Sequence, residues 1–452
     1  MTDLDPRSSI VMKLFVALQA WNIPYVVVGD TRQFPSTITS DIDLVIASGL
    51  FQKFQHLLCD FCDEEKINFV QVLKHEYEAW YCVLAWHDKS GHLWFLHPDI
   101  CCHYIRLGRS YLNSEELLAG RYQPKDNSGL ERGFFVPRPS HAFIYYLIKK
   151  IEKGQLTSDD GEYLNIQWQR DVKQALSLVQ RFWPMPLAEQ LALAATENRW
   201  SNIDSHSFKF RESLRKRAPI SVKGLWLEGQ RKINRLCNPT GIFIVFLGPD
   251  GSGKSTVLNR VKERLAPAFR RTRYYHLRPN WRCFSRKTQA TQSPHASPPR
   301  GVFASLFKLG LWWADYFIGY WLDIYRRLVS STFVVFDRYY YDLLVDARRY
   351  RYGAPRCLAI LVGKFIPKPD LVILLDAPPE ILLQRKQEVE FEELVRQRAG
   401  YKKVVNSLPN GNIVDSSKPL DQVVIQVEQI VLTYMTARLR RRQGSKGKRV
   451  WM

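Results

Sequence analysis

The sequence has little cysteine for its length, and what it has follows no metal-binding pattern. Eight cysteines are spread over 452 residues. The close pairs Cys59/Cys62 and Cys101/Cys102 have no further pair at the spacing of a four-ligand zinc site. We therefore expect reduced thiols, as is typical of cytoplasmic proteins, rather than a disulfide framework.

Long hydrophobic runs are also missing. Lys13 interrupts the first apolar run, which argues against a signal peptide. The longest apolar region, residues 302–329, contains Lys308, Asp315 and Asp323 and so falls short of the ~20 apolar residues of a membrane-spanning helix. These absences predict a cytoplasmic protein, with peripheral contact to a membrane left open.

Acidic residues are scarce in one part of the chain only. The whole sequence has 65 Lys and Arg against 44 Asp and Glu, a net charge of +21. Residues 1–200 carry 20 basic and 24 acidic side chains, so the remainder carries a net +25. Apolar residues make up 46%, which excludes a disordered chain. The basic part should favour anionic ligands, although no nucleic-acid-reading motif is present and no specific nucleic acid is expected.

The pattern of strands and helices changes near the middle of the chain. Residues 1–204 predict a small mixed sheet followed by helices, an α+β domain. Residues 205–237 predict a basic linker, and residues 238–437 alternate strands with helices, which predicts an α/β domain with a parallel sheet. Residues 438–452 form a basic tail that we expect to be disordered. The predicted strands of the second domain are residues 242–247, 333–336, 371–375 and 412–414.

The strongest motif is a glycine-rich loop between the first of these strands and a helix. Its residues, G-P-D-G-S-G-K-S-T, fit the phosphate-loop pattern G-x-x-x-x-G-K-S. Glycines let backbone N–H groups converge on phosphate oxygens, the lysine adds a mobile positive charge, and the serine after it offers a hydroxyl to Mg²⁺. The predicted nucleotide-binding residues of the loop are Gly248, Asp250, Gly251, Ser252, Gly253, Lys254, Ser255 and Thr256.

Two more polar segments follow predicted strands. Asp337-Arg338-Tyr339 comes directly after strand 333–336, where a carboxylate can bind Mg²⁺-linked water and an arginine can meet phosphate. The turn after the last strand contains Asp415, Ser416 and Lys418 and is suited to holding an adenine ring.

In these motifs and their order, residues 242–434 resemble the thymidylate kinase family of P-loop nucleoside monophosphate kinases. The resemblance implies ATP and Mg²⁺ as cofactors and Arg338 as the group that meets the acceptor phosphate. It implies the metal at Ser255 and Asp337, and catalysis at Lys254, Asp337, Arg338 and Arg385. Gly251 stands where some members have an arginine. Members without that arginine have basic residues in a mobile lid, here Arg385, Lys386, Arg396 and Arg398.

The segments that recognise thymidine in that family are replaced in this chain. The family continues after its D-R-Y triplet with a serine and an Ala-Tyr-Gln stretch, whereas this chain has Y-Y-D-L-L-V-D. Asp342 and Asp346 are therefore expected beside the acceptor, where carboxylates change the hydrogen bonds that a pocket can make. The family's E-P-G segment is also absent, and residues 274–279 stand in its place.

We therefore predict an ATP-dependent phosphotransferase of the nucleoside monophosphate kinase type. Its acceptor carries a phosphate or a hydroxyl group and need not be dTMP. Two alternatives stay open: a kinase of a saccharide or lipid-linked glycan in surface-polysaccharide synthesis, and a nucleotide-binding regulator without enzymatic activity. A homodimer also stays open.

The N-terminal part resembles the nucleotidyltransferases. Gly29 precedes Asp41-x-Asp43, which is similar to that family's glycine turn followed by Asp-x-Asp on a strand. Two carboxylates two residues apart on a strand share one face, as a two-metal site requires, and the resemblance implies Asp99 as a third. Asp30 departs from the pattern, because its charge repels phosphate unless a metal or a basic group compensates it. A working site, a scaffold without catalysis and two solvated aspartates remain alternatives, and we expect the scaffold.

Residues 303–325 predict a helix rich in aromatic residues. At 100° per residue its three charges, Lys308, Asp315 and Asp323, lie within about 80° of one another and leave a wide apolar surface. We expect this helix to be buried in the core. An apolar acceptor site and a membrane-docking helix, with Arg326 and Arg327 on anionic headgroups, remain alternatives.

Overall fold

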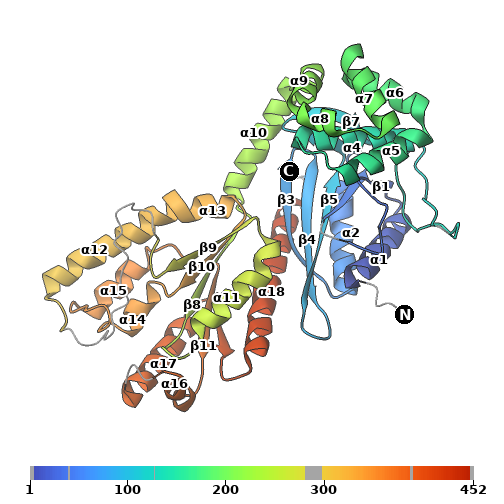
Figure 1. Ribbon diagram of the computed structural model, residues 1–452. Helices are drawn as coiled ribbons and strands as arrows, with labels where there is room; N and C mark the ends of the chain where they lie inside the picture. Colours follow the sequence, from blue (N-terminus) through green and yellow to red (C-terminus); the bar gives the residue numbers. More distant parts are fainter. Residues whose placement is uncertain (1–4, 39–40, 127, 280–297, 387–389, 448–452) are drawn as a thin grey trace. The chain divides into compact units, whose positions relative to one another are not determined.

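The computed structural model describes residues 5–38, 41–126, 128–279, 298–386 and 390–447 (Figure 1). The chain divides into two compact units. One consists of Met1–Asn234 with Leu439–Met452, and the other of Arg235–Arg438.

The first unit is built on a mixed five-stranded sheet with the order β1-β2-β5-β4-β3. The strands are β1 Tyr25–Val27, β2 Asp41–Ile46, β3 Asn68–Glu76, β4 Ala79–His87 and β5 Leu93–Cys101. Only β2 and β5 pair in parallel among these neighbours. Helices α1 (Pro6–Ala20) and α2 (Phe51–Glu64) bury Phe15, Phe54 and Leu58 in the same core as the sheet.

Helices dominate the rest of this unit. After the two-stranded sheet of β6 (His103–Arg106) and β7 (Arg109–Asn113), a second core forms around α4 (Pro139–Lys153). The remaining helices are α3 Ser114–Leu118, α5 Ser158–Arg170, α6 Val172–Phe182, α7 Met185–Glu197, α8 Ser201–Ser205, α9 Ser207–Arg217 and α10 Val222–Cys237.

The stretch expected to be a basic linker, residues 205–237, is mostly helical. Helix α9 buries Phe210 and Leu214, and the Trp183 indole donates a 3.0 Å hydrogen bond to the Phe210 carbonyl. The basic residues Lys216 and Arg217 at the end of α9 are exposed, whereas Arg215 forms a 2.6 Å ion pair with the buried carboxylate of Glu152.

The second unit contains a parallel sheet with the order β12-β11-β8-β10-β9, as predicted for this part of the chain. Its strands are β8 Ile242–Leu247, β9 Arg271–His276, β10 Thr332–Asp337, β11 Leu371–Asp376 and β12 Gly411–Asp415. Every residue of β8, β10 and β11 is buried, because a parallel sheet is covered on both faces. The helices are α11 Lys254–Leu265, α12 Val302–Gly319, α13 Tyr325–Val329, α14 Tyr341–Val345, α15 Arg356–Gly363, α16 Pro379–Arg385, α17 Phe391–Asn406 and α18 Leu420–Gly447.

Two sequence-based expectations for this unit are wrong. Strand β9 was missed, because at the sheet edge its polar sequence R-T-R-Y-Y-H leaves only Tyr275 buried. The tail was expected to be disordered from residue 438, but α18 continues to Gly447. Arg438 donates hydrogen bonds to the carbonyls of Thr240 and Gly241 at 3.0 and 2.8 Å, so the first basic residue of the tail is held by the second unit.

The aromatic helix is only half buried. Helix α12 packs Leu309, Trp312 and Tyr316 into the core, whereas Phe303 and Phe307 are 89% and 72% exposed. The helical path continues through a π-helical segment, Tyr320–Ile324, into α13. The expectation of a buried helix is therefore right for one face only. No helix among the described residues combines the length and the apolar character needed to cross a membrane.

Candidate active site

The phosphate loop connects β8, at the centre of the sheet, to the N-terminus of α11. Gly248, Gly251 and Gly253 have φ values of 150°, 83° and 78°, a region that side chains disfavour. A Cβ atom on Gly248 would lie 2.6 Å from the Leu375 carbonyl oxygen, and one on Gly251 would lie 2.6 Å from that of Leu382. The glycines are therefore required by the path of the loop, which leads backbone N–H groups toward a helix N-terminus, as phosphate binding requires.

Lys254 folds back onto this loop. Its ammonium group donates hydrogen bonds of 2.8 Å to the carbonyls of Gly248 and Pro249. Burial lowers the pKa of Lys254 to about 8, and the nearby Arg338 guanidinium contributes to this shift against the attraction of Asp250. A phosphate oxygen offers this ammonium a stronger partner than a carbonyl does.

Ser255 and Asp337 form the expected metal-binding pair. The Ser255 hydroxyl lies 3.3 Å from Oδ2 of Asp337, which stands at the end of β10. The other oxygen of Asp337, Oδ1, is buried and has no hydrogen-bond partner within the described part of the chain. An unsatisfied carboxylate oxygen beside a hydroxyl matches the oxygen ligands that Mg²⁺ prefers, so these two residues fit the ion.

Two arginines converge on the carboxylate of Asp250 in the phosphate loop. Arg338 donates to Oδ1, and Arg349 donates to Oδ2 over 2.7 Å. Burial would raise the pKa of Asp250, but Arg338, Lys254 and Arg349 together hold it well below its usual range. Paired guanidinium groups beside a phosphate loop are well suited to a second phosphate group.

Asp342 and Asp346 do not face an acceptor, contrary to the expectation from the sequence. Both are buried, with exposed fractions of 0% and 2%. Asp342 accepts hydrogen bonds from Arg338 at 2.6 Å, Tyr401 at 3.0 Å and Tyr350 at 3.2 Å. Asp346 accepts from the Gln397 amide over 3.1 Å. These carboxylates hold the surrounding side chains in place.

The sequence-based reasoning missed Arg349, Tyr350 and Tyr401. Arg349 and Tyr350 belong to the segment after α14, and Tyr401 belongs to α17. The available signal was the pair Arg348-Arg349, which follows Asp346 after a single alanine. It was passed over because nothing in the spacing shows that the chain turns back to the phosphate loop.

The expected lid residues have protein partners. Arg385 donates a 2.9 Å hydrogen bond to the Ser416 carbonyl, and so contacts the expected adenine-side turn. Arg398 forms two hydrogen bonds, of 2.6 and 3.0 Å, with Asp376 at the end of β11. Arg396 pairs with Glu393 on its own helix, and Lys386 is the C-cap residue of α16.

The turn after β12 is held by its own side chains and by its neighbouring strand. The Ser416 backbone N–H donates to the Asp376 carbonyl over 2.7 Å, and the Ser416 hydroxyl donates to the same carbonyl over 3.1 Å. The Asp415 carboxylate accepts from the Ser417 backbone N–H over 2.9 Å, whereas Lys418 is exposed. The turn is therefore a fixed surface beside β11.

In the first unit, Asp43 and Asp99 are register partners on the parallel strands β2 and β5. Lys149 of α4 donates a hydrogen bond to Asp43, and the His75 ring lies 2.8 Å from Asp99. Asp41 accepts a 2.9 Å hydrogen bond from the Tyr81 hydroxyl. The three predicted carboxylates thus lie on two adjacent strands, and each has a protein partner.

These partners bear on the second metal site that the Asp-x-Asp pattern left open. Within the described ranges, no group of three or more His, Cys, Asp or Glu residues is arranged to hold a metal ion. The repulsion expected from Asp30 is also offset, because Arg32 forms a 2.7 Å ion pair with it. The feature that stands against a metal ion here is the Lys149 ammonium group, which forms an ion pair with Asp43.

Comparisons with known proteins concern the second unit. The family model described as thymidylate kinase matches residues 246–427. A probable thymidylate kinase of Archaeoglobus fulgidus is 29% identical over 199 residues, which cover 43% of this chain and 96% of that protein. The thymidylate kinase of Lactobacillus acidophilus is 29% identical over 209 residues, with coverages of 41% and 92%.

Among solved structures, the thymidylate kinase of Candida albicans aligns with 44% of this chain and 94% of its own at 20% identity. Its TM-score of 0.33 is too low to support an argument. The family match spans the phosphate loop, Asp337-Arg338 and the turn at Asp415. The C-terminal half of the chain therefore contains a thymidylate kinase domain, and the protein is an ATP-dependent kinase.

Proposed function

We propose that the second unit transfers the γ-phosphoryl group of ATP to the phosphate group of an acceptor, as a nucleoside monophosphate kinase does. The observation that carries the proposal is the convergence of Arg338 and Arg349 on Asp250 of the phosphate loop. A phosphate-binding loop and a guanidinium pair directly beside it provide for two phosphate groups rather than one.

The residues divide the work of phosphoryl transfer among them. The loop glycines and Lys254 bind the phosphates of ATP, and Arg338 with Arg349 orients the acceptor phosphate. An acceptor oxygen attacks the γ-phosphorus, the bond from that phosphorus to the β–γ bridging oxygen breaks, and ADP leaves. Ser255 and Asp337 would hold Mg²⁺, which neutralises charge on the phosphates when it is bound. The turn at Ser416 with Arg385 supports the nucleotide base.

For the first unit we propose a nucleotidyltransferase-like scaffold without catalysis. The proposal is supported by Lys149, whose ammonium group forms an ion pair with Asp43 and so already compensates a carboxylate that a metal ion would need. The glycan kinase and the regulator without activity remain the alternatives for the whole chain, and so do a homodimer and a peripheral membrane contact.

ATP turnover by the full chain tests the proposed reaction. A coupled ADP assay would be run with dTMP, other nucleoside monophosphates and phosphorylated sugars as acceptors. Lys254→Ala is expected to abolish turnover with every acceptor, whereas Lys262→Ala, on the same helix but outside the loop, should retain it. Turnover at the wild-type rate in Lys254→Ala would refute the assignment.

A separate test concerns which residues bind ATP and which bind the acceptor. Arg338→Lys keeps the charge but loses the planar fork, so the KM for the acceptor should rise while the KM for ATP stays close to its wild-type value. If instead only the KM for ATP rose, the acceptor and nucleotide sides would have been assigned the wrong way round.

A further inference from the structure

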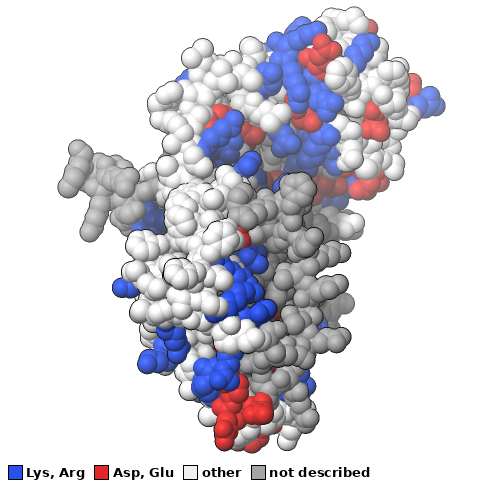
Figure 2. Space-filling model, turned by 90° about the vertical axis from the view of Figure 1, so that its left-hand side faces the viewer, with Lys and Arg blue, Asp and Glu red and all other residues white. Residues whose placement is uncertain are grey.

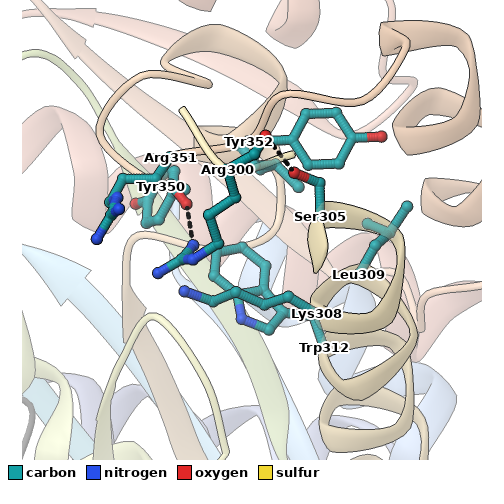
Figure 3. Close-up of a pocket in the computed structure, with 9 residues that line it drawn as sticks. Arg300, Ser305, Lys308, Leu309, Trp312, Tyr350, Arg351 and Tyr352 are labelled. Atoms are coloured by element: carbon teal, nitrogen blue, oxygen red, sulfur yellow. Dashed lines mark hydrogen bonds between the residues drawn. The ribbon is translucent and has the colours of Figure 1, made fainter. Parts of the chain in front are cut away.

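A basic pocket lies between α12 and the segment that carries Arg349. We call it the α12 pocket. Among the nine residues that line it are Arg300, Lys308, Trp312, Tyr350 and Arg351, and none of the nine is acidic (Figure 3). Its cavity volume of about 10 Å³ is about what one water molecule needs, far below the ~300–1,000 Å³ typical of a whole small-molecule site. It therefore suits one end of a ligand.

Among the described residues, the cations of the α12 pocket have no acidic partner. Arg300 donates to the Tyr350 carbonyl and Arg351 to the Pro298 carbonyl, each over 3.0 Å, and Lys308 lies 5.8 Å from the centre of the Trp312 ring. Throughout the described chain no carboxylate forms an ion pair with any of these three cations. Figure 2, seen from the side where α12 lies in Figure 1, shows blue side chains gathered with little red beside them.

Lys308 lies among other cations and is partly removed from solvent. Burial lowers the pKa of Lys308 to about 8, and repulsion from Arg300, Arg278 and Arg351 contributes to the shift. Unpaired cations that repel one another in a half-buried site are stabilised by an anion placed between them.

Tyr350 connects the α12 pocket to the expected phosphate site. Its hydroxyl donates to Asp342, which also accepts from Arg338, while its backbone carbonyl accepts from Arg300. Its two neighbours in the chain have different contacts. Arg349 forms an ion pair with Asp250, and Arg351 lines the α12 pocket. The segment Arg349–Arg351 thus contacts both the expected phosphate site and the α12 pocket.

We propose that the α12 pocket binds a second anionic group of the acceptor. The acceptor is then a phosphate ester with a further phosphate or carboxylate group away from the phosphate that receives the γ-phosphoryl group. This inference rests on the proposed function, since it extends the acceptor site of that reaction. It also gives a physical reason for an acceptor other than dTMP, which has no second anionic group.

Matched pairs of nucleotides provide the test. Dissociation constants would be measured by calorimetry on the full chain for dTMP against thymidine 3′,5′-bisphosphate, and for UMP against orotidine 5′-monophosphate. The first pair differs by a phosphate and the second by a carboxylate. One charge-assisted hydrogen bond corresponds to about tenfold or more in affinity, so the doubly anionic member of at least one pair should bind tighter by that factor.

Variants of the lining residues test whether the α12 pocket causes the preference for doubly anionic nucleotides. Lys308→Met should largely remove it, and Arg351→Met provides a second variant if Lys308→Met does not fold. Lys364→Met replaces an exposed lysine that does not line the pocket and should leave the preference intact. Equal binding within both pairs, or a preference that survives in the pocket variants, would overturn the proposal.

A separate readout keeps the two proposals apart. Phosphoryl transfer to the same four nucleotides would be followed by ADP release. Transfer to dTMP without any binding preference would refute the second-anion pocket and leave the kinase reaction standing. A binding preference that depends on Lys308, with no phosphoryl transfer to any acceptor, would support the second-anion pocket and refute the kinase reaction.

Discussion

Replacing Asp342 by Asn removes a buried negative charge while keeping the size of the side chain. The carboxylate accepts three hydrogen bonds, from Arg338, Tyr350 and Tyr401, and is fully buried. An asparagine has one acceptor oxygen, and its NH₂ group cannot accept a hydrogen bond from the Arg338 guanidinium. Arg338 then keeps Asp250 as its only acidic partner among the described residues.

The size of the loss in stability depends on how many partners Arg338 keeps. Removing one partner of a buried ion pair costs about 3–5 kcal/mol, and the lower end applies here because Asp250 still compensates Arg338. For a unit of this size, about 3 kcal/mol corresponds to a fall in Tm of about 6–12 °C. The KM for the acceptor should rise as well, since Arg338 loses the group that fixes its position.

Scanning calorimetry of the full chain measures the change in Tm, and steady-state kinetics measure the two KM values. Glu392→Gln, which neutralises an exposed carboxylate at the start of α17, is the control and should change neither. A Tm and an acceptor KM indistinguishable from wild type would refute the view that Asp342 anchors Arg338.

Further predictions concern pH, metal and the first unit. Because the pKa of Lys254 is lowered to about 8, kcat/KM for ATP should fall as pH rises through 8 in the wild type but not in Lys254→Arg, as a pH–rate series would show. The same lysine has a higher pKa when unfolded, so the unfolded chain binds more protons and this group's contribution to stability should rise with pH above 8 in calorimetric scans. Asp337→Asn should raise the Mg²⁺ concentration for half-maximal turnover by about tenfold or more, measured by metal titration. Lys149→Met should make the first unit bind Mg²⁺, because Asp43 loses the ammonium that competes with the ion; a thermal shift unchanged by Mg²⁺ would count against this.

The fold of the second unit was largely predictable because its strands are long apolar runs. Buried parallel strands such as β8 and β11 contain few polar residues, and each is followed by a distinctive turn. Strand β9 was not predictable in this way, because an edge strand pairs on one side and tolerates polar residues. Helix α18 extends beyond the expected end, and Arg438 donates there to carbonyls far away in the sequence, a contact that leaves no local pattern.

The candidate site was predictable only where residues lie together in the sequence. The phosphate loop carries its own geometry in its glycines, whereas Asp342 looked like an acceptor contact until its tyrosine partners were placed around it. Tyr401 follows Asp342 by 59 residues, and such a contact leaves no local pattern. Asp30 differs, since its charge seemed uncompensated although its partner, Arg32, is only two residues away.

The carboxylate of Asp250 serves as a built-in counter-ion for the arginine pair. With Arg338 and Arg349 already neutralised, the site has weak attraction for stray small anions, and any phosphate that enters must compete with a carboxylate held at hydrogen-bond distance. Because the pair is mostly buried, dissolved salt screens this competition little. Free orthophosphate should therefore be a poor inhibitor, and occupancy should depend on the additional contacts that a complete acceptor makes.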